Sequence, residues 1–113
     1  MKIKTSELIG TALDYMVAKC EERGGQAYLR DGKWYDPLTE EYLCYSTDWA
    51  QGGPIIEREK IDLAAMPEGE WDATSYGGEG PVDIYGPTPL IAAMRVYVAS
   101  KLGRRVEVPE ELL

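Results

Sequence analysis

The chain has 113 residues, which is the size of one domain, and its hydrophobic fraction of 44% excludes a disordered protein. Its formal charge of −8 comes from 20 acidic and 12 basic residues, and the basic ones are scattered, with Arg104–Arg105 as the only adjacent pair. Nucleic-acid phosphates are bound by clustered Lys and Arg, so this dispersion excludes a broad DNA- or RNA-binding face and we expect no such partner.

The first predicted element is a long helix over residues 7–23. Apolar residues at positions 8, 9, 12, 13, 16, 17 and 20 recur at helical spacing and form one stripe. Thr5 or Ser6 can cap this helix, and Glu7 suits the positive end of its dipole. Gly24–Gly25 is expected to end it.

A β-hairpin is predicted next, over residues 26–35. Asp31–Gly32 separates two runs that carry aromatic residues. This dipeptide favours a type I′ turn, which requires positive φ at both central residues. Asp36–Pro37 is expected to end the second strand, because proline cannot donate to a β-ladder.

The centre of the sequence predicts two short helices. Ser46 or Thr47 caps the first, and Gly52–Gly53 interrupts it. Pro54 suits the first position of the second, which runs to Glu59.

A hairpin followed by a helix is predicted for the second half of the chain. The strands cover residues 61–66 and 70–76, on either side of a Pro-Glu-Gly turn. In the last helix, Thr88 is a fitting N-cap, Pro89 a fitting first residue and Gly103 a fitting stop. Residues 106–108 form a short extended tail. The order of elements predicts an α+β fold in one domain, 1–113: a small antiparallel sheet built from both hairpins, with the two long helices packed on one face.

The cysteine and histidine content and the hydropathy of the chain indicate which cofactors and which cellular compartment to expect. The chain has no His, and its two cysteines, Cys20 and Cys44, do not form a ligand spacing, so we expect no metal and no cofactor. A disulfide between the two remains an alternative, but we favour two buried, reduced thiols in a reducing compartment. No stretch approaches about 18 consecutive apolar residues, and the N-terminus lacks an apolar leader. We therefore expect a cytoplasmic protein without a membrane partner.

Three runs of the sequence resemble the NinX-like family of small tailed-phage proteins. They are Lys4-Thr5-Ser6-Glu7-Leu8, Tyr45-Ser46-Thr47-Asp48-Trp49-Ala50-Gln51-Gly52-Gly53-Pro54-Ile55-Ile56 and Gly86-Pro87-Thr88-Pro89-Leu90-Ile91-Ala92-Ala93-Met94-Arg95. The resemblance spans nearly the whole chain, with the second and third runs specific in combination. It implies a phage-encoded accessory protein made in the bacterial host cytoplasm. It implies no catalytic residue, since neither specific run encodes a reaction.

The richest candidate for a binding segment runs from Tyr45 to Pro54. Glycines let a backbone approach a ligand closely, and the N–H groups of a helix start suit an anion. Aromatic rings there could stack on a base or sugar. The structural alternative is that the hydroxyls cap, the indole packs into the core and the glycines permit a turn. The candidate ligand-binding residues are Tyr45, Ser46, Thr47, Asp48, Trp49, Gly52 and Gly53.

A second candidate lies at the start of the last helix, at Gly86 and Thr88. Taken alone it is a plain helix start, but if both helix starts converge, their positive dipole ends would favour a phosphate or carboxylate. Arg95 or Arg58 could add a fixed cation.

These patterns lead us to expect a non-catalytic protein, since no metal, thiol or triad constellation is present. The favoured hypothesis is a pocket for a small anionic, nucleotide-like host ligand, formed by Tyr45–Pro54 and the start of the last helix. The alternative is a module that binds a host or phage protein through an acidic, Tyr- and Trp-rich surface. Such side chains are enriched at interfaces, so we also expect a homodimer. Exposure of Trp49 in an open cleft would favour the pocket.

Overall fold

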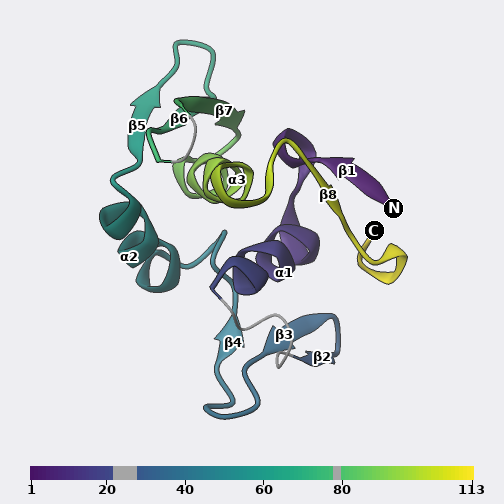
Figure 1. The fold of residues 1–113 in the computed structure, drawn as a ribbon. Helices are drawn as coiled ribbons and strands as arrows, with labels where there is room; N and C mark the ends of the chain where they lie inside the picture. The colour runs from purple at the N-terminus through teal and green to yellow at the C-terminus, as the bar shows by residue number, and fades with distance from the viewer. Residues whose placement is uncertain (22–27, 78–79) are drawn as a thin grey trace.

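The computed structural model describes residues 1–21, 28–77 and 80–113, and over these residues the protein is an α+β fold (Figure 1). The predicted continuation of the first helix to Arg23, its Gly24–Gly25 stop and the first two residues of the hairpin lie outside the described residues. The described helices are α1 (Gly10–Cys20), α2 (Trp49–Glu59) and α3 (Pro89–Leu102), with 3₁₀ turns η1 (Thr5–Glu7) and η2 (Glu110–Leu112).

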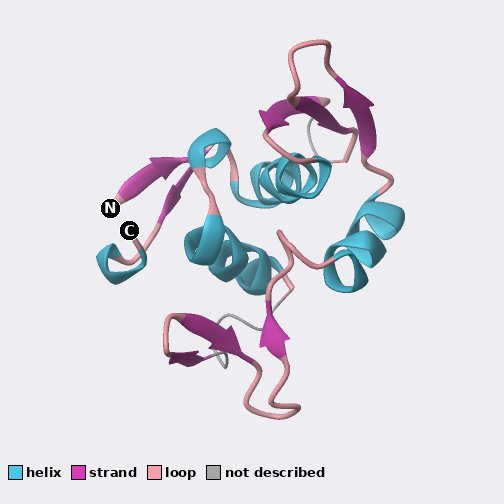
Figure 2. Cartoon of the chain, turned by 180° about the vertical axis from the view of Figure 1, so that it is seen from behind, coloured by secondary structure: helices cyan, strands magenta, loops and turns pink. Residues whose placement is uncertain are grey.

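The strands form three separate antiparallel sheets in the described part of the chain. The prediction of one sheet built from both hairpins is therefore wrong, because each hairpin acquires a third strand of its own (Figure 2). The sheets are β1 (Lys2–Lys4) with β8 (Arg105–Glu107); β2 (Tyr28–Arg30), β3 (Lys33–Tyr35) and β4 (Tyr42–Leu43); and β5 (Asp62–Ala65), β6 (Trp71–Ser75) and β7 (Val82–Gly86).

The first hairpin turns as its sequence predicts. Asp31 and Gly32 have φ values of 54° and 76°, the positive pair that a type I′ turn requires. Pro37 follows the strand end, and the chain then returns as β4, which the sequence analysis did not predict. The inner face of this sheet packs on α1, where the Trp34 and Tyr15 ring centroids lie 4.9 Å apart.

Helix α2 is continuous, so the predicted interruption at Gly52–Gly53 and the fresh start at Pro54 are both wrong. Asp48, rather than Ser46 or Thr47, is its N-cap. A Cβ at Gly52 would lie 2.5 Å from the Leu90 side chain, so this glycine permits close packing on α3 instead of breaking the helix. Pro54 lies on an exposed side, where water can reach the Ala50 carbonyl that proline leaves without an N–H donor.

Helix α3 is the centre of the core and follows its prediction. The Thr88 hydroxyl accepts a hydrogen bond from the Ile91 N–H at 3.1 Å, Pro89 is the first residue, and Gly103 follows the last. The helix packs on the β5–β6–β7 sheet and also contacts α1, α2 and η1. Because α1 packs on α3 and β3, the two long helices do not share one sheet face, contrary to prediction.

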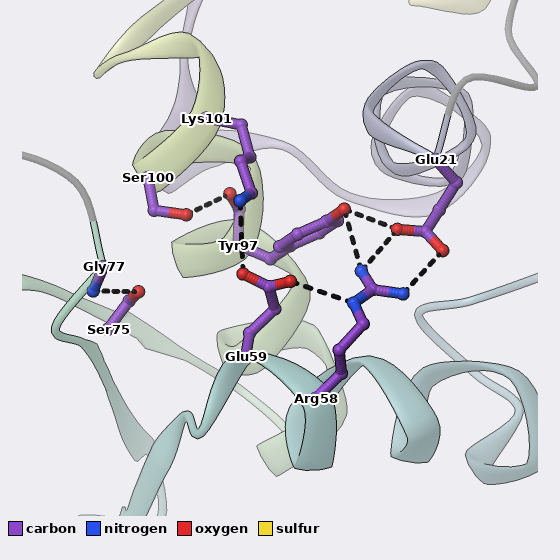
Figure 3. A network of polar contacts seen from close by, with 8 residues as sticks. All are labelled: Glu21, Arg58, Glu59, Ser75, Gly77, Tyr97, Ser100 and Lys101. Carbon is purple, nitrogen blue, oxygen red and sulfur yellow. Dashed lines mark hydrogen bonds and ion pairs between the residues drawn. The ribbon is translucent and has the colours of Figure 1, made fainter.

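A polar network ties the three helices together at one end of α3 (Figure 3). The Arg58 guanidinium donates to both carboxylate oxygens of Glu21, at 2.6 and 3.1 Å, and to Glu59 at 2.9 Å. The Tyr97 hydroxyl donates to Glu21, and Lys101 pairs with Glu59 at 3.2 Å. Burial, followed by the Glu21 hydrogen bond, raises the pKa of Tyr97. Arg58 of α2 therefore links the end of α1, through Glu21, to α3, through Tyr97.

The predicted extended tail at 106–108 corresponds to β8, which pairs with β1 and brings the two chain ends together (Figure 1). The Met1 ammonium donates to the Val108 carbonyl at 3.0 Å and also pairs with Glu107. Among the described residues, no helix combines the length and apolarity needed to cross a bilayer.

Candidate functional site

The starts of α2 and α3 meet around a surface hollow of about 240 Å³. Sequence reasoning made the site conditional on this convergence, and the structure places the two helix starts together. The hollow is lined by Ser46, Thr47, Trp49, Thr88, Pro89, Leu90 and Ile91.

Trp49 is the first residue of α2 and forms one wall of the hollow. Its side chain is 53% exposed. Burial of a large aromatic side chain is ordinarily favourable, so this exposure is unusual. The structural alternative, in which the indole packs into the core, is therefore wrong for this residue. An open hollow with one exposed aromatic wall can accept a flat ring by stacking.

The two helix starts differ in their electrostatics. Asp48 caps α2, with its carboxylate accepting from the Ala50 N–H at 2.9 Å. Its negative charge offsets the positive dipole end of α2. Thr88 caps α3 with an uncharged hydroxyl, so the α3 start retains its positive end. An anionic group would therefore be favoured on the α3 side of the hollow.

Ser46 is held in place by Asp14, a residue that sequence reasoning missed. The buried Asp14 carboxylate, 6% exposed, accepts from the Ser46 N–H at 2.9 Å and from its hydroxyl at 2.7 Å. Burial raises the pKa of Asp14, and the two hydrogen bonds from Ser46 oppose that rise. The signal was a carboxylate beside the apolar stripe of the first helix, next to Leu13. Asp14 thus fixes one wall of the hollow to α1.

The remaining predicted residues support the site without lining it. Tyr45 is buried, with 5% of its surface exposed, and the Gly52 backbone packs closely on Leu90. Gly86 packs closely as well, since a Cβ there would lie 2.7 Å from the Ala92 nitrogen. A Cβ at Gly53 would meet only the Trp49 ring, at 3.8 Å.

Arg95 does not act as the predicted cation of the hollow. Its guanidinium donates to the carbonyl of Leu8 at 2.7 Å and to that of Tyr85 at 3.0 Å. Desolvation lowers its pKa. The residue joins α3 to the segment before α1 and to β7, and it lines a different surface hollow together with Glu70 and Asp83.

A row of tyrosines covers the outer face of the β2–β3–β4 sheet. Tyr28, Tyr35 and Tyr42 stand opposite one another in register, with successive ring centroids 5.8 and 5.9 Å apart. Arg30 lies over the Tyr35 ring and Lys33 over the Tyr42 ring, at 4.9 and 5.3 Å from the centroids. The sequence did contain a signal for this row, because the three tyrosines lie seven residues apart.

Both cysteines are free thiols. Burial raises the pKa of Cys20 to about 11 and also raises the pKa of Cys44. Within residues 1–21, 28–77 and 80–113, no group of three or more His, Cys, Asp or Glu side chains could hold a metal ion.

Fold and site together define a small α+β protein with three antiparallel sheets in its described part and an open hollow walled by a tryptophan. The model of the family described as "Bacteriophage P22, NinX" matches residues 4–101, and the chain belongs to this family of phage proteins. The resemblance noted in the sequence is thereby confirmed. A comparison with curated proteins finds no match.

Proposed function

We propose that the protein is a non-catalytic phage accessory protein that binds a small anionic, nucleotide-like host ligand in the hollow between α2 and α3. The observation that carries this proposal is the half-exposed Trp49 ring at the wall of that hollow. A core tryptophan would have favoured a purely structural segment.

The lining residues suggest how such a ligand would lie. Its ring would stack on Trp49, which is worth roughly 1–3 kcal/mol for a base. The Thr88 oxygen already accepts from Ile91, so its O–H is available to donate to the ligand. Thr47 donates to the Cys44 carbonyl at 3.4 Å, so its oxygen is available to accept. The negative group would face the start of α3, away from Asp48.

Sequestration is the role that we propose for this binding. Membership of a phage family supports action in the cytoplasm of the infected bacterium. There, a protein that holds a host signalling nucleotide would lower its free concentration without chemistry and so act against host defence.

The test is titration of the protein with mono-, di- and cyclic nucleotides, followed by calorimetry and thermal shift. We expect Trp49→Leu to weaken binding about tenfold or more. Asp48→Asn should tighten it, since the amide keeps the cap and removes a negative charge beside the ligand. Tyr76→Leu is the control, because Tyr76 is also an exposed aromatic residue, at 62%, and is not a lining residue of the hollow. No binding of any nucleotide, or equal loss in both aromatic variants, would exclude the proposal.

A second candidate function rests on the tyrosine row of the β2–β3–β4 sheet. Aromatic rings and Arg are enriched at protein interfaces, and in the described part of the chain Arg30 and Lys33 form no ion pair. This face would suit an acidic partner protein or a second copy of this chain, itself acidic. Light scattering tests the dimer: a mass of twice 12.6 kDa that falls to the monomer value in Tyr42→Ala would favour this face as the interface.

A further inference from the structure

The ribbon formed by the two chain ends contains an unfavourable charge pair. In its register, Lys2 stands opposite Glu107 and Ile3 opposite Val106, which are complementary pairs. Lys4 stands opposite Arg105. Like charges directly opposite each other on an antiparallel pair are destabilising.

A hollow of about 290 Å³ opens beside this pair. Its lining residues are Lys4, Thr5, Ser6, Ile84, Arg104 and Arg105. The three cations are exposed, whereas Ile84 is buried and belongs to the core. In the described part of the chain, none of these cations forms an ion pair, and no carboxylate lines this hollow.

Backbone contacts hold the cations around the hollow. The Thr5 N–H donates to the Arg104 carbonyl at 2.8 Å, and its hydroxyl donates to the Gly103 carbonyl at 2.7 Å. These bonds fix η1 to the turn between α3 and β8. The backbone around the cations is therefore fixed by hydrogen bonds to the buried Thr5, although their side chains are exposed.

An adjoining hollow has a different charge. It shares Ser6, Ile84 and Arg104 with the first and adds Glu70, Asp83, Tyr85 and Arg95. Glu70 interacts electrostatically with Arg95. Negative charge thus lies on one side of Arg104 and is absent from the lining on the other, so an anion would be confined to the first hollow.

We propose that the hollow between η1, β7 and β8 is a binding site for the phosphate group of a small ligand. Among the residues that the structure describes, three cations without an ion pair line this one hollow, although the chain has a net charge of −8. A bound phosphate would neutralise the Lys4–Arg105 pair, and a guanidinium matches phosphate oxygens bidentately. The site shares no lining residue with the Trp49 hollow and does not depend on the function proposed above.

The experiment is calorimetric titration of the full chain with inorganic pyrophosphate, with sodium chloride at matched ionic strength as the salt control. We expect wild type to bind and Arg104→Ala to bind at least about tenfold more weakly, since a charge-assisted hydrogen bond is lost. Lys2→Ala is the control: Lys2 is a cation on β1 like Lys4, but it stands opposite Glu107 and does not line the hollow. It should bind as wild type does.

Arg105→Glu adds a readout that a purely structural role would not give. This substitution turns a like-charge pair into an opposite-charge pair, so we expect a higher melting temperature and no pyrophosphate binding. A lower melting temperature would show that the pair is not under strain and would overturn the proposal. So would absence of binding to wild type, equal loss in Lys2→Ala, or tighter binding of a single-stranded oligonucleotide, titrated in the same way, than of pyrophosphate.

Discussion

The Asp14 carboxylate in α1 and the Ser46 backbone and hydroxyl, 32 residues apart, form a buried pair of hydrogen bonds. Ser46 leads directly into Asp48, the cap of α2, and lines the Trp49 hollow. The first helix therefore determines where the second begins. The geometry of the candidate site depends on a residue that does not touch the hollow.

Removing the Asp14 carboxylate should destabilise the protein. Asp14→Ala leaves two buried donors of Ser46 without an acceptor, so we expect a loss of about 2–3 kcal/mol in the free energy of unfolding. Asp14→Asn keeps one acceptor oxygen and should lose less. Urea denaturation of the two variants measures the difference, and equal losses would contradict the importance of the acceptor.

The same carboxylate should give the protein a pH signature. Burial raises the pKa of Asp14 in the folded state, so the folded protein binds the Asp14 proton more tightly than the unfolded chain does. The stabilisation from this group is full below the unfolded pKa of about 3.9 and is lost as pH rises through the folded pKa. The stability of wild type relative to Asp14→Asn should therefore fall over that window. A difference that stays constant or rises would contradict the direction of the shift.

Two adjacent glycines of α2 should respond in opposite ways to alanine. A Cβ at Gly52 would lie 2.6 Å from the Tyr45 carbonyl oxygen as well as against Leu90, so Gly52→Ala should cost about 1–3 kcal/mol by overpacking. Gly53→Ala meets no close atom and should stabilise the helix by about 0.5–1 kcal/mol. Thermal denaturation of the pair provides its own control, and a stability loss shared by both variants would argue against this packing.

The polar network at the end of α3 should stabilise the fold more through the buried Tyr97 than through the exposed Arg58. Tyr97 is 2% exposed, whereas the Arg58 side chain is 50% exposed and largely screened by water. Tyr97→Phe removes the hydrogen bond to Glu21 and should cost about 1–2 kcal/mol. Tyr85→Phe, at an exposed tyrosine, is the control and should change little. A double-mutant cycle with Arg58→Ala should reveal coupling, because both residues contact the Glu21 carboxylate.

Both thiols should be unreactive in the folded protein at neutral pH. The thiolate is the reactive form, and burial raises the pKa of Cys20 to about 11. Cys44 is only 8% exposed, which also limits access. A thiol reagent should label two cysteines quickly in denaturant and neither quickly without it, with the Cys20 rate rising toward alkaline pH. Fast labelling at neutral pH would contradict this environment.

Local chemistry explains which parts of the fold were predictable. The Asp31–Gly32 turn and the Thr88, Pro89 and Gly103 boundaries of α3 depend on neighbouring residues only, and all were confirmed. Gly52 was misinterpreted because its reason is the approach of Leu90, which lies 38 residues further along the chain and is invisible to a local pattern.

The same distinction applies to the sheets and the site. β4 and β7 were missed because each is fixed by its partner strand, and helical periodicity could not show that α1 packs on α3. Local cap chemistry anticipated two helix starts that could build a hollow. It could not show that Arg95 reaches the carbonyls of Leu8 and Tyr85 instead, since those contacts exist only after folding.

Pairing of β1 with β8 has a consequence for the order of folding. Its closing contact joins Met1 to Val108, 107 residues away, so nearly the whole chain must be arranged before the ribbon gains any free energy. The ribbon is therefore expected to form late and to open before the α3 core does. The hollow beside Lys4 and Arg105 would exist only in the completed structure. A ligand that binds there would therefore stabilise the pairing of the two chain ends against local opening.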